Sequence, residues 1–164
     1  MDLLTQAKEF IARKASKLAM AMHIGIETAG SPLATINELG GAVVVSDFGN
    51  NAGLLLGPVI ADWRNVPFES LQTEVFIDGK SVGKGGAMSL PGGPLAGLAF
   101  ALARCARRGL PMKSGYVVST GATTGVHDIR IGQESRVVFQ GCGELLCRAI
   151  PAQKAPSAQK GARA

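Results

Sequence analysis

The stretch Thr73-Glu-Val-Phe-Ile-Asp-Gly-Lys-Ser-Val82 contains two short apolar runs separated by the dipeptide Asp78-Gly79. β-Branched and aromatic residues favour extended backbone. A two-residue turn between antiparallel strands needs positive φ at both central positions, and Gly adopts positive φ without steric cost. The stretch therefore predicts a β-hairpin with a type I′ turn.

Further runs rich in β-branched residues predict more strands on both sides of this hairpin. The 22 Gly and 8 Pro punctuate the 164 residues at short intervals, as in proteins whose strands are joined by tight turns, and this excludes an all-helical fold. The other predicted strands are Ala42–Ser46, Leu54–Ile60, Val117–Ser119, Arg136–Phe139 and Leu145–Ile150.

Two helices are predicted from apolar residues at helical spacing. Residues 3–18 place an apolar stripe opposite mostly basic residues, which indicates an amphipathic helix that packs on the core; a helix on a membrane surface is the alternative. The second helix starts at Gly93-Pro94 and ends at Gly109, with arginines in its last turns, where cations face the negative end of the helix dipole.

The length and composition predict a single domain. At 46% hydrophobic residues, 164 residues can bury one core but hardly two. We expect residues 1–20 to form the amphipathic helix and residues 21–150 the domain. Residues 151–164 consist of small and polar types with nothing to bury, so we expect a disordered tail.

Charge and cysteine usage exclude several classes of protein. The net charge is +5, but residues 21–103 hold three basic residues against seven acidic ones, and no stretch interleaves basic and aromatic residues as a nucleic-acid binder would. No apolar run reaches the roughly 18 residues that span a membrane. The three cysteines lack a CxxC spacing and fit reduced thiols in the cytoplasm.

Three polar stretches could carry chemistry. Glu27 precedes a Gly-Ser-Pro turn, where its carboxylate can bind a hard cation or cap the turn. Ser46–Gly53 holds short polar side chains between two buried runs, either to fix a substrate's oxygens or as a simple turn with left-handed Asn residues. Ser119–Gly125 offers hydroxyls and backbone amides suited to a carboxylate. His23 and His127 are single, and we expect His23 to be a packed residue.

Four motifs together resemble the 2-keto-4-pentenoate hydratase and 4-oxalocrotonate decarboxylase family of the fumarylacetoacetate hydrolase superfamily. The likeness covers about Ala21 to Ile150, and several motifs in register are more specific than any single one. In order, the motifs are Ile24-Gly-Ile-Glu27 with Gly30-Ser-Pro, Asp47-Phe-Gly-Asn-Asn-Ala-Gly with Leu56-Gly57, Gly92-Gly-Pro-Leu95, and Ser119-Thr-Gly121.

The resemblance implies an α+β fold, a roll built round a curved mixed β-sheet with a few packed helices. It also implies a Mg²⁺- or Mn²⁺-dependent lyase that hydrates 2-hydroxy-2,4-dienoates from aromatic meta-cleavage. Relatives decarboxylate 4-oxalocrotonate, and another hydrolase or decarboxylase of the superfamily remains an alternative parent. Both chemistries pass through an enolate beside a 2-oxo acid, whose developing charge a divalent cation stabilises.

Residue by residue, the resemblance implies a metal-ligand role for Glu27 and catalytic roles for Asp47 and Asn50. Asn51 resembles part of the substrate-lining turn, and Thr120 and Gly121 resemble the loop beneath the substrate. Relatives usually carry Asp at the positions of Tyr116 and Gln133, and we expect these two positions to support turns.

The resemblance also implies that an amino-terminal domain with a Glu-x-Glu pair is missing. No pair with that spacing precedes Glu27, so we expect a divalent cation to bind weakly, since one carboxylate leaves it mostly hydrated. Two interpretations stay open: a hydratase-like lyase, active or impaired by the truncation, or a non-catalytic remnant that assembles with a full-length hydratase or decarboxylase. We expect a homo-oligomer or a partner subunit, and neither nucleic acid nor membrane as a partner.

Overall fold

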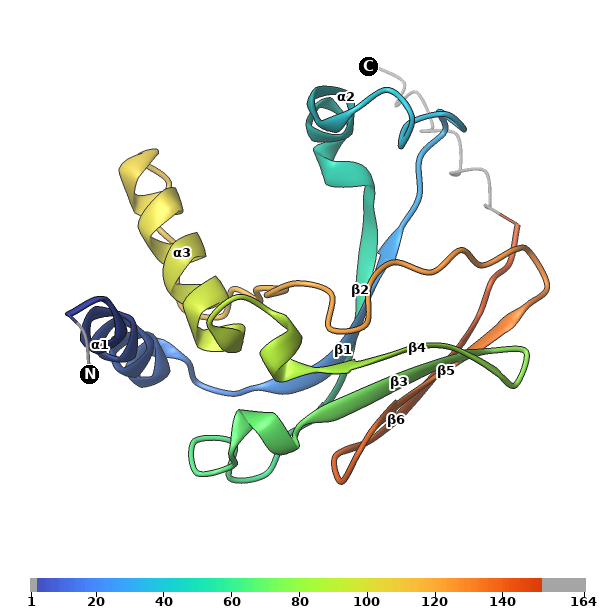
Figure 1. Ribbon diagram of the computed structural model, residues 1–164. Helices are drawn as coiled ribbons and strands as arrows, with labels where there is room; N and C mark the ends of the chain where they lie inside the picture. The colour runs from blue at the N-terminus through green and yellow to red at the C-terminus, as the bar shows by residue number, and fades with distance from the viewer. Residues whose placement is uncertain (1–2, 152–164) are drawn as a thin grey trace, which may run out of the picture.

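The computed structural model describes residues 3–151, which form helices beside two antiparallel sheets (Figure 1). This confirms the predicted combination of helices and strands in one α+β chain. The disordered tail predicted for residues 151–164 lies, apart from residue 151, outside the described residues, as do residues 1 and 2.

The larger sheet has four strands in the order β4-β3-β5-β6. The predicted hairpin is confirmed: Asp78 and Gly79 have φ of 48° and 78°, the two positive values that a type I′ turn needs. The hairpin consists of β3 and β4, and β3 also pairs antiparallel with β5 in the centre of the sheet. The bounds are β3 (Gln72–Ile77), β4 (Lys80–Gly86), β5 (Glu134–Phe139) and β6 (Gly143–Arg148).

The second sheet consists of two strands, β1 (His23–Ala29) and β2 (Asn51–Val59), which also pair antiparallel. The prediction of one mixed sheet is therefore wrong for the described residues, in which every strand pair is antiparallel. Parallel neighbours need a long crossover between strands. Here the chain leaves β1, makes short helical turns and returns along the same strand in the opposite direction.

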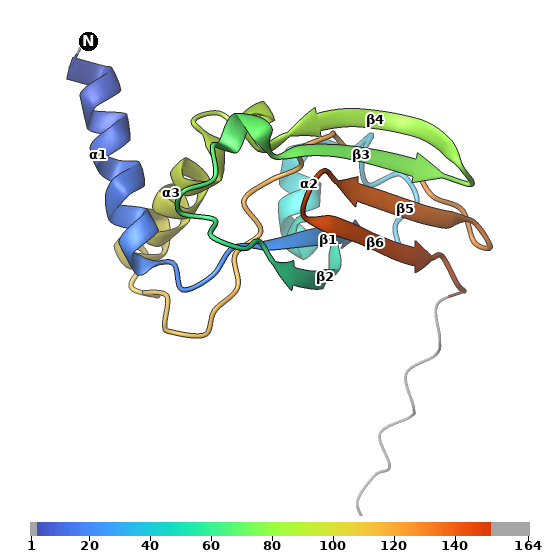
Figure 2. The same cartoon turned by 90° about the horizontal axis from the view of Figure 1, so that it is seen from below.

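The helices lie mostly at one end of the molecule. In Figure 2, α1 (Leu3–Leu18) and α3 (Gly93–Arg107) lie side by side, away from the larger sheet. The predicted bounds of α3 are confirmed, because Pro94 lies in its first turn and Gly109, with φ of 74°, follows its end. Three short 3-10 helices are η1 (Phe48–Asn50), η2 (Phe68–Ser70) and η3 (Ala87–Ser89).

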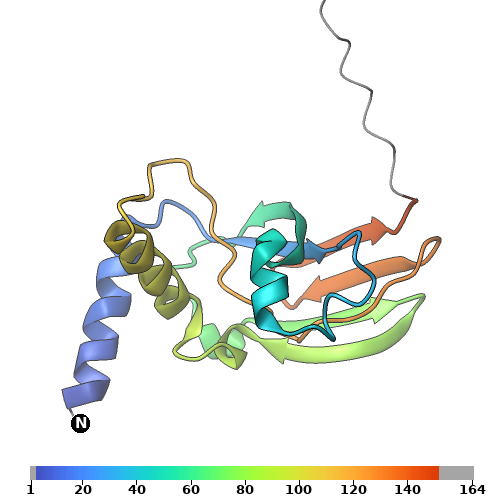
Figure 3. The same ribbon diagram turned by 90° about the horizontal axis from the view of Figure 1, so that it is seen from above.

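Two predicted strands are wrong. Residues 42–46 belong to the short helix α2 (Gly41–Ser46), which lies at the end of the β1–β2 pair (Figure 3). Ser46 Oγ hydrogen-bonds to the carbonyl of Ala42, 3.0 Å away, within this turn. β-Branched residues lose only a little stability in a helix, and a strand here would have no neighbour to pair with. Residues 117–119 include two β-branched valines, but they pair with no strand.

The core lies where the β1–β2 sheet meets the end of the larger sheet. Its buried centre is Ile24, Ile60 and Trp63, and Phe139 and Leu145 pack against it from β5 and β6. Gly57 permits this packing, because a Cβ there would lie 2.7 Å from Ile24 and 2.9 Å from Leu145. The β1–β2 sheet is thereby fixed against the larger sheet.

The apolar stripe predicted for α1 is only partly covered. Ala15 is buried, but Phe10 and Ile11 are about half exposed and Leu18 is 69% exposed. The helix itself is confirmed, and it packs on α3 rather than on the sheets. Within residues 3–151, no helix has both the length and the apolar character needed to cross a membrane.

Candidate functional site

A cavity of about 1300 Å³ lies between the β1–β2 sheet, α3 and one face of the larger sheet. Val75 and Val137 form part of its apolar floor, since alternate side chains of β3 and β5 point to this face and are buried. Polar side chains from loops and strand ends line the rest. The cavity is thus apolar on the sheet side and polar where the loops meet it.

Glu27 lies near the end of β1, shortly before the Gly-Ser-Pro turn noted in the sequence, and lines this cavity. Its Oε1 accepts a hydrogen bond from Asn51 Nδ2 at 2.9 Å, and its Oε2 accepts one from Ser119 Oγ at 2.7 Å. The carboxylate joins side chains 24 and 92 residues away in the chain. The sequence left two interpretations of Glu27 open, a cation ligand or a cap of the turn. These bonds do not show a cap formed by backbone amides, since both donors are side chains.

Asn50, in the turn before β2, and Asn51, the first residue of β2, line the same cavity. Phe48, Gly49 and Asn50 all have positive φ, between 48° and 71°, which places the turn in left-handed backbone. Asn tolerates this conformation better than most residues do. The carbonyl of Asn50 accepts a hydrogen bond from Gly30 N at 2.9 Å, which ties the turn to the end of β1.

Thr120 and Gly121 also line the cavity, from a segment that runs beside α3. A Cβ at Gly97 of α3 would lie 3.0 Å from the Thr120 carbonyl oxygen, so the segment packs closely on the helix. Gly121 has φ of 129°. The structure therefore brings Glu27, Asn50 and Asn51 to the same cavity as Thr120 and Gly121.

Asp47 is not among the residues that line the cavity. It ends α2, its backbone amide donates to the carbonyls of Val43 and Val44, and its carbonyl accepts from Asn50 N at 2.8 Å. These contacts hold the turn that presents Asn50. The catalytic role that the resemblance implies for Asp47 stays a prediction.

The sequence did not predict how three further polar residues contribute to the cavity: Ser119 is a partner of Glu27, and His23 and His127 also line the cavity. His23 is half-buried, with Nδ1 2.7 Å from the carbonyl oxygen of Gly57. His127 Nε2 lies 3.2 Å from Thr124 Oγ1. The alternation of β1 could have indicated His23, because residues 23 and 27 fall on the same face of a regular strand.

The described residues do not form a complete site for a divalent cation. Nowhere in residues 3–151 do three or more His, Cys, Asp or Glu side chains gather in a way that could hold a metal ion. Mg²⁺ and Ca²⁺ take six or more oxygen ligands. Glu27 supplies one carboxylate, and both of its oxygens already accept hydrogen bonds. The donor set of this chain therefore does not fit such an ion on its own.

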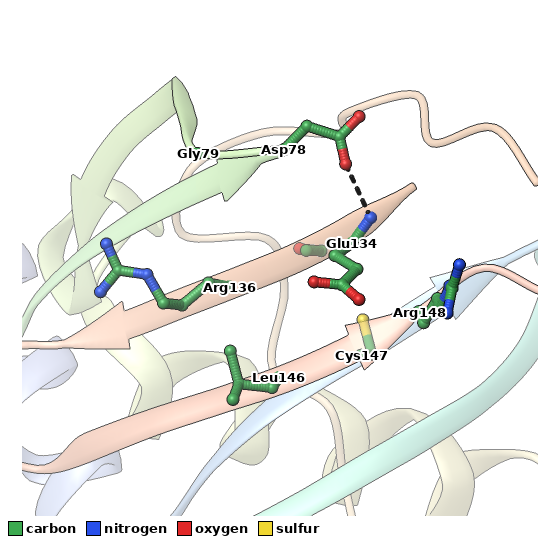
Figure 4. Close-up of a pocket in the computed structure, with 8 residues that line it drawn as sticks. Asp78, Gly79, Glu134, Arg136, Leu146, Cys147 and Arg148 are labelled. Atoms are coloured by element: carbon green, nitrogen blue, oxygen red, sulfur yellow. Dashed lines mark hydrogen bonds between the residues drawn. The ribbon is translucent and has the colours of Figure 1, made fainter. Parts of the chain in front are cut away.

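A second, shallower depression of about 480 Å³ lies at the ends of β5 and β6 (Figure 4). There Asp78 Oδ1 accepts from Glu134 N at 2.9 Å and Oδ2 from Gln133 Nε2 at 2.8 Å. The hydrogen bond from the Glu134 backbone amide lowers the pKa of Asp78 most, and the hydrogen bond from the Gln133 side chain lowers it further. These bonds connect two turns, so the carboxylate is used for structure.

The fold is similar to that of a decarboxylase of the fumarylacetoacetate hydrolase superfamily, which confirms the resemblance seen in the sequence. Two similar solved structures are of 4-oxalocrotonate decarboxylase from Pseudomonas putida G7. The complex with calcium and acetate has a TM-score of 0.61, and the complex with magnesium and adipate has 0.59. Both are 26% identical to this chain and match 66% of it.

This chain spans 42% and 41% of the length of those two decarboxylase chains. No family model matches the sequence, and no curated protein matches it. The likeness to the decarboxylase therefore rests on structure together with the 26% identity.

Proposed function

We propose that this chain is a hydratase-like lyase that acts on 2-hydroxy-2,4-dienoates or related 2-oxo acids of aromatic meta-cleavage. The observation that carries this proposal is the shared cavity of Glu27, Asn50, Asn51, Thr120 and Gly121. These residues come from three segments far apart in the chain. A cytoplasmic location is part of the proposal and fits the three free cysteines.

The cavity suits a small acid with a hydrocarbon chain. The amide groups of Asn50 and Asn51 and the hydroxyl of Thr120 can donate hydrogen bonds to carboxylate and 2-oxo oxygens. The apolar floor at Val75 and Val137 can take the diene carbons. Donors directed at the oxygen that gains charge stabilise an enolate more than the starting acid, which is what accelerates such a reaction.

Glu27 is the residue that would contact Mg²⁺ or Mn²⁺ in this chain. A divalent cation would supply charge neutralisation at the enolate oxygen. Because the cavity lining offers two carboxylates, Glu27 and Asp128, and no group of three potential ligands within residues 3–151, we propose that binding of the ion is weak. Asp47 would contribute by holding the turn that carries Asn50.

A spectrophotometric assay tests the proposal. The purified chain is mixed with 2-hydroxypentadienoate and, separately, with 4-oxalocrotonate, each with and without Mg²⁺, and loss of diene absorbance is followed. Turnover of the dienoate supports the hydratase type, and turnover of 4-oxalocrotonate alone supports the decarboxylase type. No turnover of either acid at high protein concentration would refute the lyase.

A second candidate function is that of a non-catalytic subunit beside a full-length hydratase or decarboxylase. The incomplete donor set around Glu27 favours it, because a partner could supply further carboxylates. Co-expression with a full-length relative and affinity capture of this chain tests the pairing. A complex that survives washing would support this candidate, and clear turnover by the isolated chain would reject it.

A further inference from the structure

The segment Met112–Ile129, here called the strap, contains no helix or strand. It leaves the end of α3, passes beside the β1–β2 sheet and reaches the larger sheet before β5 (Figure 1). Every residue of the strap lines the cavity, including Thr120 and Gly121. An irregular segment of this length is uncommon inside a domain and is usually functional or disordered. Its position therefore needs a physical cause.

Glycines let the strap approach its neighbours closely. A Cβ at Gly97 would lie 3.0 Å from the Thr120 carbonyl oxygen. A Cβ at Gly85 would clash with the Thr123 carbonyl oxygen, and one at Gly83 with the ring of His127. These contacts fix how near the strap comes to α3 and β4. They do not hold it to the β1–β2 sheet, because none of the three glycines lies there.

The polar contact between the strap and the β1–β2 sheet is the hydrogen bond from Ser119 Oγ to Glu27 Oε2, at 2.7 Å. Hydrogen bonds to a carboxylate are shorter and stronger than neutral ones. Asn51 Nδ2 holds the other oxygen of Glu27 from the first residue of β2. The carboxylate thus connects β1, β2 and the strap at one point, directly before Thr120.

We propose that Glu27, Ser119 and Asn51 form a clamp that positions Thr120 and Gly121 at the cavity. In this arrangement Ser119 is a positioning residue, and Asn51 positions Glu27 in addition to any contact with substrate. The consequence for ligand binding rests on the proposed function. The clamp itself does not, because it concerns only how the strap is held.

Hydrogen exchange of the full chain, followed by mass spectrometry, measures the clamp without a ligand. S119A removes the bond from Ser119 to Glu27, and E27A removes that bond together with the bond from Asn51. We therefore expect amides of residues 117–125 to exchange roughly three- to tenfold faster in S119A, the range for one net hydrogen bond, and at least as fast in E27A. E27Q can still accept from Asn51 and donate to Ser119, and we expect exchange within about twofold of wild type.

T28V is the matched control. Thr28 Oγ1 donates to the Gly53 carbonyl at 3.2 Å, so this hydrogen bond lies within the same pair of strands and does not join them to the strap. We expect unchanged exchange of residues 117–125 in this variant. Exchange in S119A and E27A no faster than in T28V would overturn the clamp, and so would equal acceleration in E27Q and E27A.

Calorimetry with oxalate in the presence of Mg²⁺ adds the ligand. S119A leaves the Glu27 carboxylate in place, so weaker oxalate binding in S119A, by roughly three- to tenfold, supports positioning of Thr120 and Gly121 by the clamp. Oxalate binding in S119A equal to wild type would refute that step. Absence of oxalate binding by wild type would refute the proposed function, while the exchange result would still decide the clamp.

Discussion

Asp78 and Gln133 show how single side chains fix a turn. Gln133 Oε1 accepts from Arg130 N at 2.8 Å and its Nε2 donates to Asp78 Oδ2, so Gln133 supports the turn, as predicted for a position where relatives carry Asp. Tyr116 N likewise bonds to the Lys113 carbonyl in a turn. At this scale the sequence predicted which residues form turns, but not their partners, because those lie up to 55 residues away.

The stability of the chain should depend on the ionisation of Asp78. The Glu134 amide lowers the pKa of Asp78 in the folded state, so this carboxylate stabilises the fold above its unfolded pKa, and that contribution is lost as pH falls through the lower folded pKa. D78N keeps a side chain suited to the positive φ and removes the titration. Urea unfolding between pH 7 and pH 3 should show the wild-type advantage over D78N shrinking with acid. A gap constant over this range would contradict the assignment.

Phe48 should carry backbone strain. Its φ is 54° and it is 90% exposed, so its left-handed conformation costs free energy that burial of the ring does not offset. F48G relieves the conformation, whereas F48A removes the ring alone. We expect F48G to be more stable than F48A by about 0.5–1 kcal/mol in urea unfolding. Equal stability of the two variants would show that the turn is unstrained.

At the scale of elements, the local sequence predicted a helix or strand correctly where the residues that specify it lie close together in the chain. Turn residues within a few positions specify the β3–β4 hairpin, and residues at its two ends specify α3 in the same way. Residues 42–46 are β-branched but form α2, because whether a run becomes a strand depends on a neighbour that the local sequence does not contain. The same reason explains why residues 117–119 lie in the strap.

The packing of β2 on β1 and β6 should depend on Gly57. A Cβ there would lie within 3 Å of both Ile24 and Leu145, in the core. We expect G57A to lower the free energy of unfolding by about 1–3 kcal/mol, the usual cost of overpacking. G41A is the control, since nothing lies within 4 Å of a Cβ at Gly41. Equal effects of the two substitutions in thermal unfolding would refute the close packing.

At the scale of the whole molecule, large apolar side chains remain exposed on and near the α1–α3 pair. Leu18, Met20, Phe100 and Leu110 are each at least 66% exposed. Apolar surface of this kind often marks a contact with another chain. We expect the chain, of 16.9 kDa, to sediment as a species larger than the monomer. A single monomeric species at micromolar concentration would contradict this expectation.

The site could be predicted only in part from the sequence. Glu27, Asn50, Asn51, Thr120 and Gly121 were named from the resemblance, and the structure places all five at one cavity. The bond from Ser119 to Glu27 could not be foreseen, because nothing in the sequence near either residue specifies a contact across 92 positions.

The most direct test of the account is an isothermal titration of the chain with oxalate in the presence of Mg²⁺. Oxalate carries the adjacent carboxylate oxygens of a 2-oxo acid and cannot react further. We predict saturable binding of one oxalate per chain, lost in a variant that combines N50A with T120A. No saturable heat with the wild-type chain would contradict the claim that this cavity binds a small 2-oxo acid.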